Sequence, residues 1–485
     1  MYYRELFKLC GYTDKEIEGD APRIDAVFAK AGIGPKEIDR GVERLHRYFW
    51  VESEGVRKVW GIWMKQFIDL TLAREEHSKL VYYTYPLEPR VSCAVNCAGA
   101  FAQTPEFVNG FILGYMFGML DPYFDIAEQN GMLPGTGMCG LNKIRLASFL
   151  KGLTPLPDLL CVSSFFCDNE SKTDELISYH FPGTPRVYID NVMDSNWDEW
   201  VDTYPRMPHH RVAYFAGELE SFLAELRERH EIDVTPDHLN TSRVEFTKLW
   251  IGFQRVLECM KADPIPIPNN DLALFAFMVT NPERRTIAEG MQAIELLISD
   301  AQKRIERGEG VVAKGSPRVA WCTPWLTDPT INPMIEESGL APILSPIFWV
   351  HPSDVVKSEY STFAEKTAEA FLRMGLMYNS PAFIWKIEEC IRHFKLDGLF
   401  WDYGYPCRPT CGHAFMIKKL VEEDLGVPVL LLESEQIDSR DTPIGALRTR
   451  VEAFAEMLRI RKAQNKGILE RPFHSTRKTP AARSR

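Results

Sequence analysis

Eleven cysteines are the residues of this 485-residue sequence whose type allows the most chemistry. The N-terminus lacks a basic region followed by an apolar run, so we expect neither export nor the disulfides of an oxidising compartment. We therefore expect a cytoplasmic protein with reduced thiols. In such a protein cysteines serve buried packing, metal ligation or catalysis, and the choice among these decides the function. They stand at positions 10, 93, 97, 139, 161, 167, 259, 322, 390, 407 and 411.

Three cysteines lie in segments that follow or adjoin predicted strand ends, where an open α/β sheet binds its ligands. Cys167 follows the predicted strand 159–163, and Cys407 follows the predicted strand 397–401 in the same way. Cys139 lies in a Gly- and Pro-rich stretch directly before a predicted helix, whose N-terminus favours thiolate over thiol. Thiolates converging from three loops would suit an iron–sulfur cluster, because soft sulfur ligands select iron–sulfur or zinc over hard cations.

The spacing of these cysteines leaves buried packing open as the alternative. None of the three belongs to a Cys-x-x-Cys motif, and free cysteines are among the residues most often buried. Cys10, Cys259 and Cys390 lie in helical patterns, and we assign them to packing. Four further thiols lie near the predicted site, and we also assign these to packing: Cys93, Cys97, Cys161 and Cys411.

Several common functional classes lose support from the sequence. No predicted strand is followed by Gly-x-Gly-x-x-Gly, and the P-loop, His-Glu-x-x-His and Gly-x-Ser-x-Gly motifs do not occur. Lysine and arginine number 56 against 67 acidic residues, a net charge of −11 that argues against a nucleic-acid partner. The longest apolar stretch, 107–120, is too short to cross a bilayer, so no membrane association is expected.

The elements that must position the cysteines form an α/β protein. Short apolar runs alternate with helical patterns in two regions, which predicts two doubly wound parallel sheets flanked by helices. The predicted strands are 80–84, 159–163 and 186–190, then 318–322, 340–344, 397–401 and 427–432. The predicted divisions are a helical N-terminal extension (1–78), a first α/β domain (79–206), a helical bridge (207–310), a second α/β domain (311–465) and a basic flexible tail (466–485).

The segments around the three cysteines resemble the 2-hydroxyacyl-CoA dehydratase family, which also contains the ATP-dependent benzoyl-CoA reductases. The resemblance covers about residues 79–460, and its most specific part is the C-terminal block that includes 448–454. The matching segments are 125–131 leading into 138–144, 156–172, and 405–409 followed by 426–440.

This resemblance implies two flavodoxin-like domains and a [4Fe-4S] cluster held by Cys139, Cys167 and Cys407, with one iron open to a non-protein ligand. It implies an acyl-CoA substrate, a homologous or identical second subunit in a dimer, and a separate ATP-dependent iron–sulfur activator. The implied reaction is dehydration of an (R)-2-hydroxyacyl-CoA by one-electron reduction of the thioester to a ketyl radical, in anaerobic metabolism.

Four alternative functions or sites remain open. One is a dearomatising aryl-CoA reductase of the benzoyl-CoA type. Another is a double-cubane cluster reductase, in which Cys411 would add a ligand, and a third is a non-catalytic electron-transfer subunit. A zinc site on the same thiols is a further alternative. Ser92 and Cys93 stand where the family carries a carboxylate, so no catalytic residue is assigned there.

Overall fold

The computed structural model describes most of the chain. The described residues are 1–84, 89–135, 137–163, 167–190, 200–201, 204–205, 208–322, 327–351, 358–373, 380–404, 406–464 and 467–468. Of the predicted tail, all but 467 and 468 lies outside them, so the prediction of a flexible tail stays a prediction.

The N-terminal region is helical, as predicted, and its longest helix lies in the core. Trp60 and Trp63 of this helix, α5, are fully buried, and Gly55 lets it lie against α15. A Cβ at Gly55 would lie 2.6 Å from the backbone nitrogen of Leu297. The helices of this region are α1 (Arg4–Leu9), α2 (Asp14–Gly19), α3 (Ala21–Ala31), α4 (Pro35–Tyr48), α5 (Glu54–Thr71) and α6 (Ala73–Glu76).

The first parallel sheet has the order β2-β1-β3-β4 in the described chain. All five residues of β3 are buried, as expected for an apolar run covered on both faces. Three of its strands match the predicted ones, whereas the three-residue strand β2 was not predicted. The strands are β1 (Leu80–Tyr83), β2 (Phe101–Gln103), β3 (Leu159–Ser163) and β4 (Arg186–Ile189).

The helices of this first lobe surround that sheet. They are α7 (Pro89–Cys97), α8 (Pro105–Asn109), a π-helix (Gly110–Met116), α9 (Asp121–Gln129), α10 (Gly140–Leu150) and α11 (Asp168–His180). A short antiparallel pair follows, β5 (Trp200–Val201) with β6 (Tyr204–Pro205).

The second parallel sheet repeats the topology of the first. Its order is β10-β9-β7-β8, so in both sheets the first strand lies between the second and the third, and the fourth lies beyond the third. This is the flavodoxin-like order, with its switch point between the first and third strands. The α/β prediction is therefore confirmed. The strands are β7 (Arg318–Trp321), β8 (Ala341–Leu344), β9 (Gly398–Asp402) and β10 (Val429–Leu432).

The helices of the second lobe follow the same alternation. They are α16 (Pro333–Glu337), α17 (Phe363–Leu372), α18 (Ser380–Phe394), α19 (Arg408–Leu425) and α20 (Ile444–Ala463), with 3-10 turns at Pro346–Phe348 and Ser439–Asp441.

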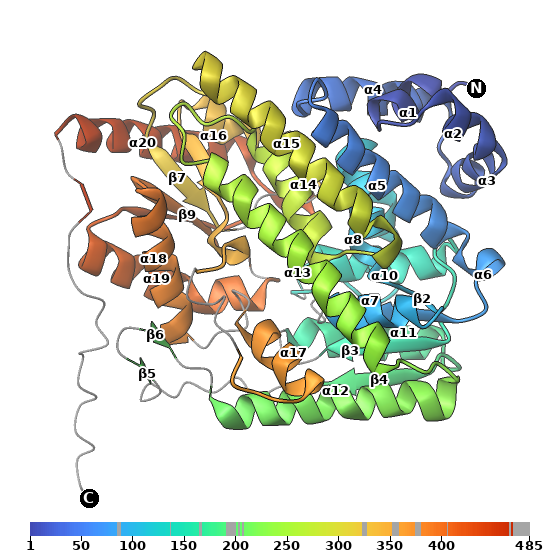
Figure 1. The fold of residues 1–485 in the computed structure, drawn as a ribbon. Coiled ribbons are helices and arrows are strands. Elements are labelled where there is room, and N and C mark those ends of the chain that lie inside the picture. The colour runs from blue at the N-terminus through green and yellow to red at the C-terminus, as the bar shows by residue number, and fades with distance from the viewer. Residues whose placement is uncertain are drawn as a thin grey trace, which may run out of the picture.

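Long helices connect the two lobes along the chain. In Figure 1, α13 and α15 run side by side across the molecule, from near the second sheet to near the first. Most of 209–307 is helical, as predicted. No described helix is long and apolar enough to cross a membrane. These helices are α12 (His209–His230), α13 (Pro236–Cys259), α14 (Asn269–Thr280) and α15 (Ile287–Arg307), with a 3-10 turn at Arg284–Thr286.

Candidate metal centre

Each of the three predicted ligands lies at the N-terminus of a helix. Cys139 is the N-cap of α10, Cys167 of α11 and Cys407 of α19, and all three have extended backbone angles. Cys167 follows β3 and Cys407 follows β9, which is the third strand of its own sheet. Because parallel strands end at one edge of a sheet, this placement sets both thiols at carboxyl edges, beside the positive ends of helix dipoles.

The structure brings these three thiols together. The pKa of Cys139 is raised well above its ordinary value by burial, and then by the charges of Glu435, Cys407 and Cys167. Burial raises the pKa of Cys167 to about 12, with a further contribution from Cys407. Burial also raises the pKa of Cys407. The segments that carry the three thiols adjoin one another, because the Asn169 side chain donates to the carbonyl oxygens of Gly137 and Pro406.

Two effects act in opposite directions on the pKa of Cys139. The N-terminus of α10 favours the thiolate, because the backbone N–H of Leu141 lowers the pKa, whereas burial is the larger effect and raises it. Amide groups nevertheless oppose this shift by donating to the sulfurs. These donors are the backbone N–H groups of Leu141 to Cys139, of Asn169 and Arg408 to Cys167, and of Thr410 to Cys407.

The chemistry of this donor set fits a metal–sulfur cluster. Thiol sulfurs are soft ligands, and N–H groups that donate to sulfur stabilise the thiolate form that a cluster requires. Among the described residues, no three His, Cys, Asp or Glu side chains lie close enough to hold a single metal ion. Thiolates on a cubane bind separate irons and so stand further apart than the ligands of one ion.

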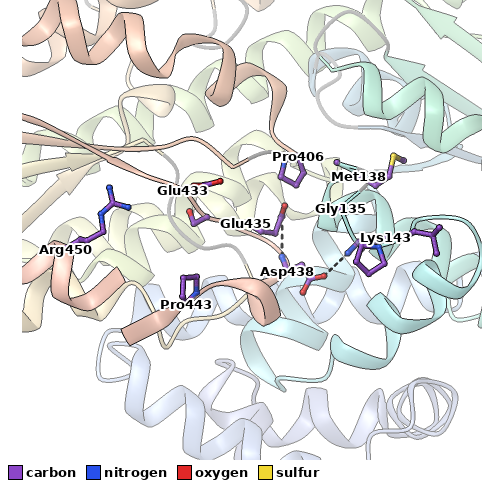
Figure 2. Close-up of a pocket in the computed structure, with 13 residues that line it drawn as sticks. Gly135, Met138, Lys143, Pro406, Glu433, Glu435, Asp438, Pro443 and Arg450 are labelled. Carbon is purple, nitrogen blue, oxygen red and sulfur yellow. Dashed lines mark hydrogen bonds and ion pairs between the residues drawn. The ribbon is translucent and has the colours of Figure 1, made fainter. Parts of the chain in front are cut away.

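A cavity of about 390 Å³ opens beside the thiols, between the two lobes. Met138 and Pro406, the neighbours of Cys139 and Cys407, lie on its wall. Figure 2 shows side chains from α10 and the preceding loop facing residues from the loops that follow β9 and β10. Its wall includes Gly137, Met138 and Lys143 from the first lobe, and Pro406, Glu435 and Asp438 from the second.

Glu435 is the carboxyl group on the cavity wall whose charge acts on the thiols of Cys139 and Cys407. Burial raises its pKa to about 7, although the backbone N–H groups of Ile437 and Asp438 donate to it at 3.2 and 3.4 Å. It lies within the segment that carries the family resemblance, but sequence reasoning gave it no role.

Ion pairs join the lobes next to this cavity. The Lys143 ammonium lies 2.9 Å from the carboxylate of Asp438 and 2.8 Å from that of Glu128 (Figure 2 shows the first pair). Arg440 also binds Asp438, at 2.7 Å, and reaches Asp125 on α9 at 2.6 Å. Because the Lys143 and Asp438 side chains are 8% and 3% exposed, this pair fixes the C-terminal loop against α10.

Beneath the thiols of the first lobe lies a buried charged triad. Arg145 of α10 forms ion pairs with Glu106 of α8 and, at 2.7 Å, with Glu170 of α11. Burial raises the pKa of Glu170 to about 7 despite the nearby Arg145. The triad joins the helices that begin at Cys139 and Cys167. The sequence gave no signal for it, because its members are 25 and 39 residues apart.

The cysteines assigned to packing occupy varied places. Cys10 and Cys390 are buried, and burial raises the pKa of each thiol. Cys259 is half-buried, and its sulfur lies 3.4 Å from the carbonyl oxygen of Arg255. Cys411 lies one turn into α19, half-buried. The other thiols near the predicted site are Cys93 and Cys161, both buried, and Cys97, half-buried.

The fold and the site define a class of α/β proteins in which thiols from two doubly wound lobes meet at helix N-termini. Comparison with known proteins identifies the family. The family model described as 2-hydroxyglutaryl-CoA dehydratase, D-component, matches residues 95–458, and the chain belongs to this family.

Two curated relatives are similar to this chain at low identity. The chain is 21% identical over 320 residues to the (R)-2-hydroxyglutaryl-CoA dehydratase, subunit alpha, of Acidaminococcus fermentans, covering 63% of this chain and 61% of the relative. It is 20% identical over 325 residues to the (R)-2-hydroxyisocaproyl-CoA dehydratase alpha subunit of Clostridioides difficile, covering 64% of this chain and 74% of that relative. The chain thus matches about three fifths of the length of the first relative.

Proposed function

We propose that this chain is the iron–sulfur subunit of an ATP-activator-dependent acyl-CoA enzyme, a (R)-2-hydroxyacyl-CoA dehydratase. Cys139, Cys167 and Cys407 would be the ligands of its [4Fe-4S] cluster. One observation carries the proposal: in a chain of the dehydratase family, three cysteines from distant segments meet at three helix N-termini. We propose the cytoplasm as its location, since thiols stay reduced there.

The protein groups around the thiols prepare them for ligation. Burial keeps the thiols protonated in the unloaded chain, so binding of the cluster releases their protons and is favoured as the pH rises. The amide donors listed above then stabilise the sulfur charge. When bound, such a cluster would supply single electrons and a Lewis-acid site.

The cavity would hold an acyl-CoA thioester beside the thiols. Met138 and Pro406, the neighbours of Cys139 and Cys407 in the chain, lie on its wall. The Lys143–Asp438 pair closes one wall and fixes the spacing of the two loops. An acyl-CoA would therefore be held at the junction of the lobes.

A second subunit and a separate activator are part of the proposal. Both relatives are named as alpha subunits, which supports a partner subunit for this chain as well. The chain has no Gly-x-x-x-x-Gly-Lys-Ser/Thr loop, which agrees with ATP being hydrolysed by a partner.

Turnover by the intact complex tests this function. The chain is co-expressed with its partner subunit and purified without oxygen, then supplied with ATP, a reductant and the activator. A panel of (R)-2-hydroxyacyl-CoA thioesters is scanned for enoyl-CoA formation, with benzoyl-CoA as the competing substrate. We expect dehydration of at least one hydroxyacyl thioester and no ring reduction. Ring reduction without dehydration, or no turnover by an iron-loaded complex, would contradict the proposal.

A further inference from the structure

One buried side chain joins the three segments that carry the cysteines. Asn169 lies just after Cys167, at the start of α11, and its side chain is excluded from solvent. Its Nδ2 group donates at 2.9 Å to the carbonyl oxygen of Gly137, in the loop before Cys139. The same group donates at 2.8 Å to the carbonyl oxygen of Pro406, the residue before Cys407.

The orientation of this amide is set by its partners. Both partners are carbonyl oxygens, which only accept, and the Nδ2 group has one hydrogen for each. The opposite orientation would place the Oδ1 oxygen against two acceptors. Asn169 is itself held in place, because its carbonyl oxygen accepts from Asn142 Nδ2 at 3.1 Å and from Thr173 Oγ1 at 2.6 Å.

From this geometry we infer that Asn169 is a positioning residue that sets the spacing of Cys139, Cys167 and Cys407 in the chain before any metal binds. Asn169 is not itself a metal ligand. It acts by holding the loops that carry the cysteines. The inference rests on the proposed function to the extent that these thiols are ligands. The second link, Asp168 to Arg408 at 3.0 Å, joins only two of the loops. Its side chains are 49% and 35% exposed, so it contributes little.

Few other side chains fit this position. Aspartate has the same shape but would set a carboxylate against two carbonyl oxygens, and leucine has the volume without the donors. Either change leaves the carbonyls of Gly137 and Pro406 without this donor and lets the loops separate. Loss of such a supporting contact lowers metal affinity by about 10- to 100-fold.

The test compares Asn169→Asp and Asn169→Leu with a matched control. The control is Asn130→Asp, because the Asn130 amide donates only within its own helix, to the carbonyl of Ile126 at 2.7 Å. The full chain is first studied without metal. A short bifunctional thiol reagent, dibromobimane, is used to bridge cysteine pairs, and the bridges are located by peptide mapping. Thermal unfolding is recorded for every variant.

The metal-bound state gives the second measurement. Each variant is loaded anaerobically with iron and sulfide, and iron per chain and the electron paramagnetic resonance spectrum of the reduced protein are recorded. We expect both Asn169 variants to lose bridging between Cys139 and Cys407, to bind iron about 10- to 100-fold more weakly and to show an altered spectrum. Each Asn169 variant loses two buried hydrogen bonds, so its unfolding temperature should fall a few degrees below that of the control while the transition stays cooperative. If Asn169→Leu does not fold, Asn169→Ser replaces it.

Two kinds of failure are distinguishable. Wild-type bridging, iron and spectrum in the Asn169 variants would overturn the positioning role while leaving the cysteine ligands in place. Lost bridging together with loss of the cooperative unfolding transition would also overturn it, since general disruption of the fold would then suffice. By contrast, unchanged iron in Cys407→Ala would remove the ligand assignment, whatever Asn169 does.

Discussion

The two lobes share a strand order but contribute unequally to the site. In each lobe a cysteine follows the third strand, Cys167 after β3 and Cys407 after β9. The helix before that strand differs. In the first lobe it is α10, which Cys139 caps, whereas in the second it is α18, and the sequence has no cysteine within 373–389. A repeated fold therefore supplies two equivalent thiols, and the third comes from the N-terminus of α10 in the first lobe.

The buried polar groups beneath the thiols differ as well. The first lobe holds the charged triad of Arg145, Glu106 and Glu170. The second holds Asp402, which accepts from the indole N–H of Trp321 and, at 3.3 Å, from the hydroxyl of Ser434. A buried ion pair that loses one partner leaves a buried charge, whereas loss of a neutral donor costs less. The first lobe should thus be the more sensitive to substitution.

The largest effect should come from Arg145→Met. Glu106 and Glu170 would lose their buried cation, and we expect the free energy of unfolding to fall by about 3–5 kcal/mol. Trp321→Phe in the second lobe removes one donor from Asp402 and should cost about 1–3 kcal/mol. Urea unfolding measures both, and equal losses would show that the lobes do not differ in this respect.

The stability of the protein should depend on pH through Glu388 of α18, the second-lobe counterpart of α10. Burial raises the pKa of Glu388 to about 8, and Asp424 of α19 raises it further while Arg392 opposes. The folded protein therefore keeps a proton that the unfolded chain loses near pH 4.3. The stability from this group is complete below that pH and is lost between there and about pH 8, by about 5 kcal/mol in all, at about 1.4 kcal/mol per pKa unit. Urea unfolding at pH 5, 7 and 9 should show a flatter decline for Glu388→Gln, and parallel curves would refute this.

Two glycines near the cysteine caps give opposite predictions. A Cβ at Gly140, next to Cys139, would lie 2.6 Å from Ile437 of the second lobe, so Gly140→Ala should destabilise by about 1–3 kcal/mol. Gly412 in α19 has no atom within 4 Å of such a Cβ, so Gly412→Ala should stabilise by up to about 1 kcal/mol. Thermal unfolding compares the two, and the same sign for both would contradict this contact between the lobes.

The smallest effect should come from Asp168→Asn. Lys172 and then Arg408 lower the pKa of this carboxyl, so its pairs stabilise the fold above the unfolded pKa and lose this contribution as the pH falls. These side chains are about half exposed, so we expect a cost of about 0–1 kcal/mol that shrinks with added salt. A larger, salt-independent cost would make this exposed pair, and not Asn169, the main link between α11 and α19.

The sequence predicted those parts of the fold that depend on local pattern. Continuous apolar runs located seven of the eight parallel strands in the described chain, and β2 escaped because it has three residues. The three cysteines were singled out because Cys167 and Cys407 follow predicted strands and Cys139 precedes a predicted helix. Asn169 and Glu435 received no role, since their partners are distant: Asn169 bonds to Pro406 across 237 positions. The burial that raises the pKa of the Cys139 thiol could not be predicted, because it depends on the assembled lobes.

The most direct test of the central claim counts iron and acid-labile sulfide in the anaerobically purified chain. The wild type should hold about four of each. Cys139→Ala, Cys167→Ala and Cys407→Ala should each lower the count sharply, whereas the buried controls Cys10→Ala and Cys390→Ala should retain it. Equal losses in all five variants, or no loss in the first three, would contradict the claim that the two lobes jointly hold one cluster.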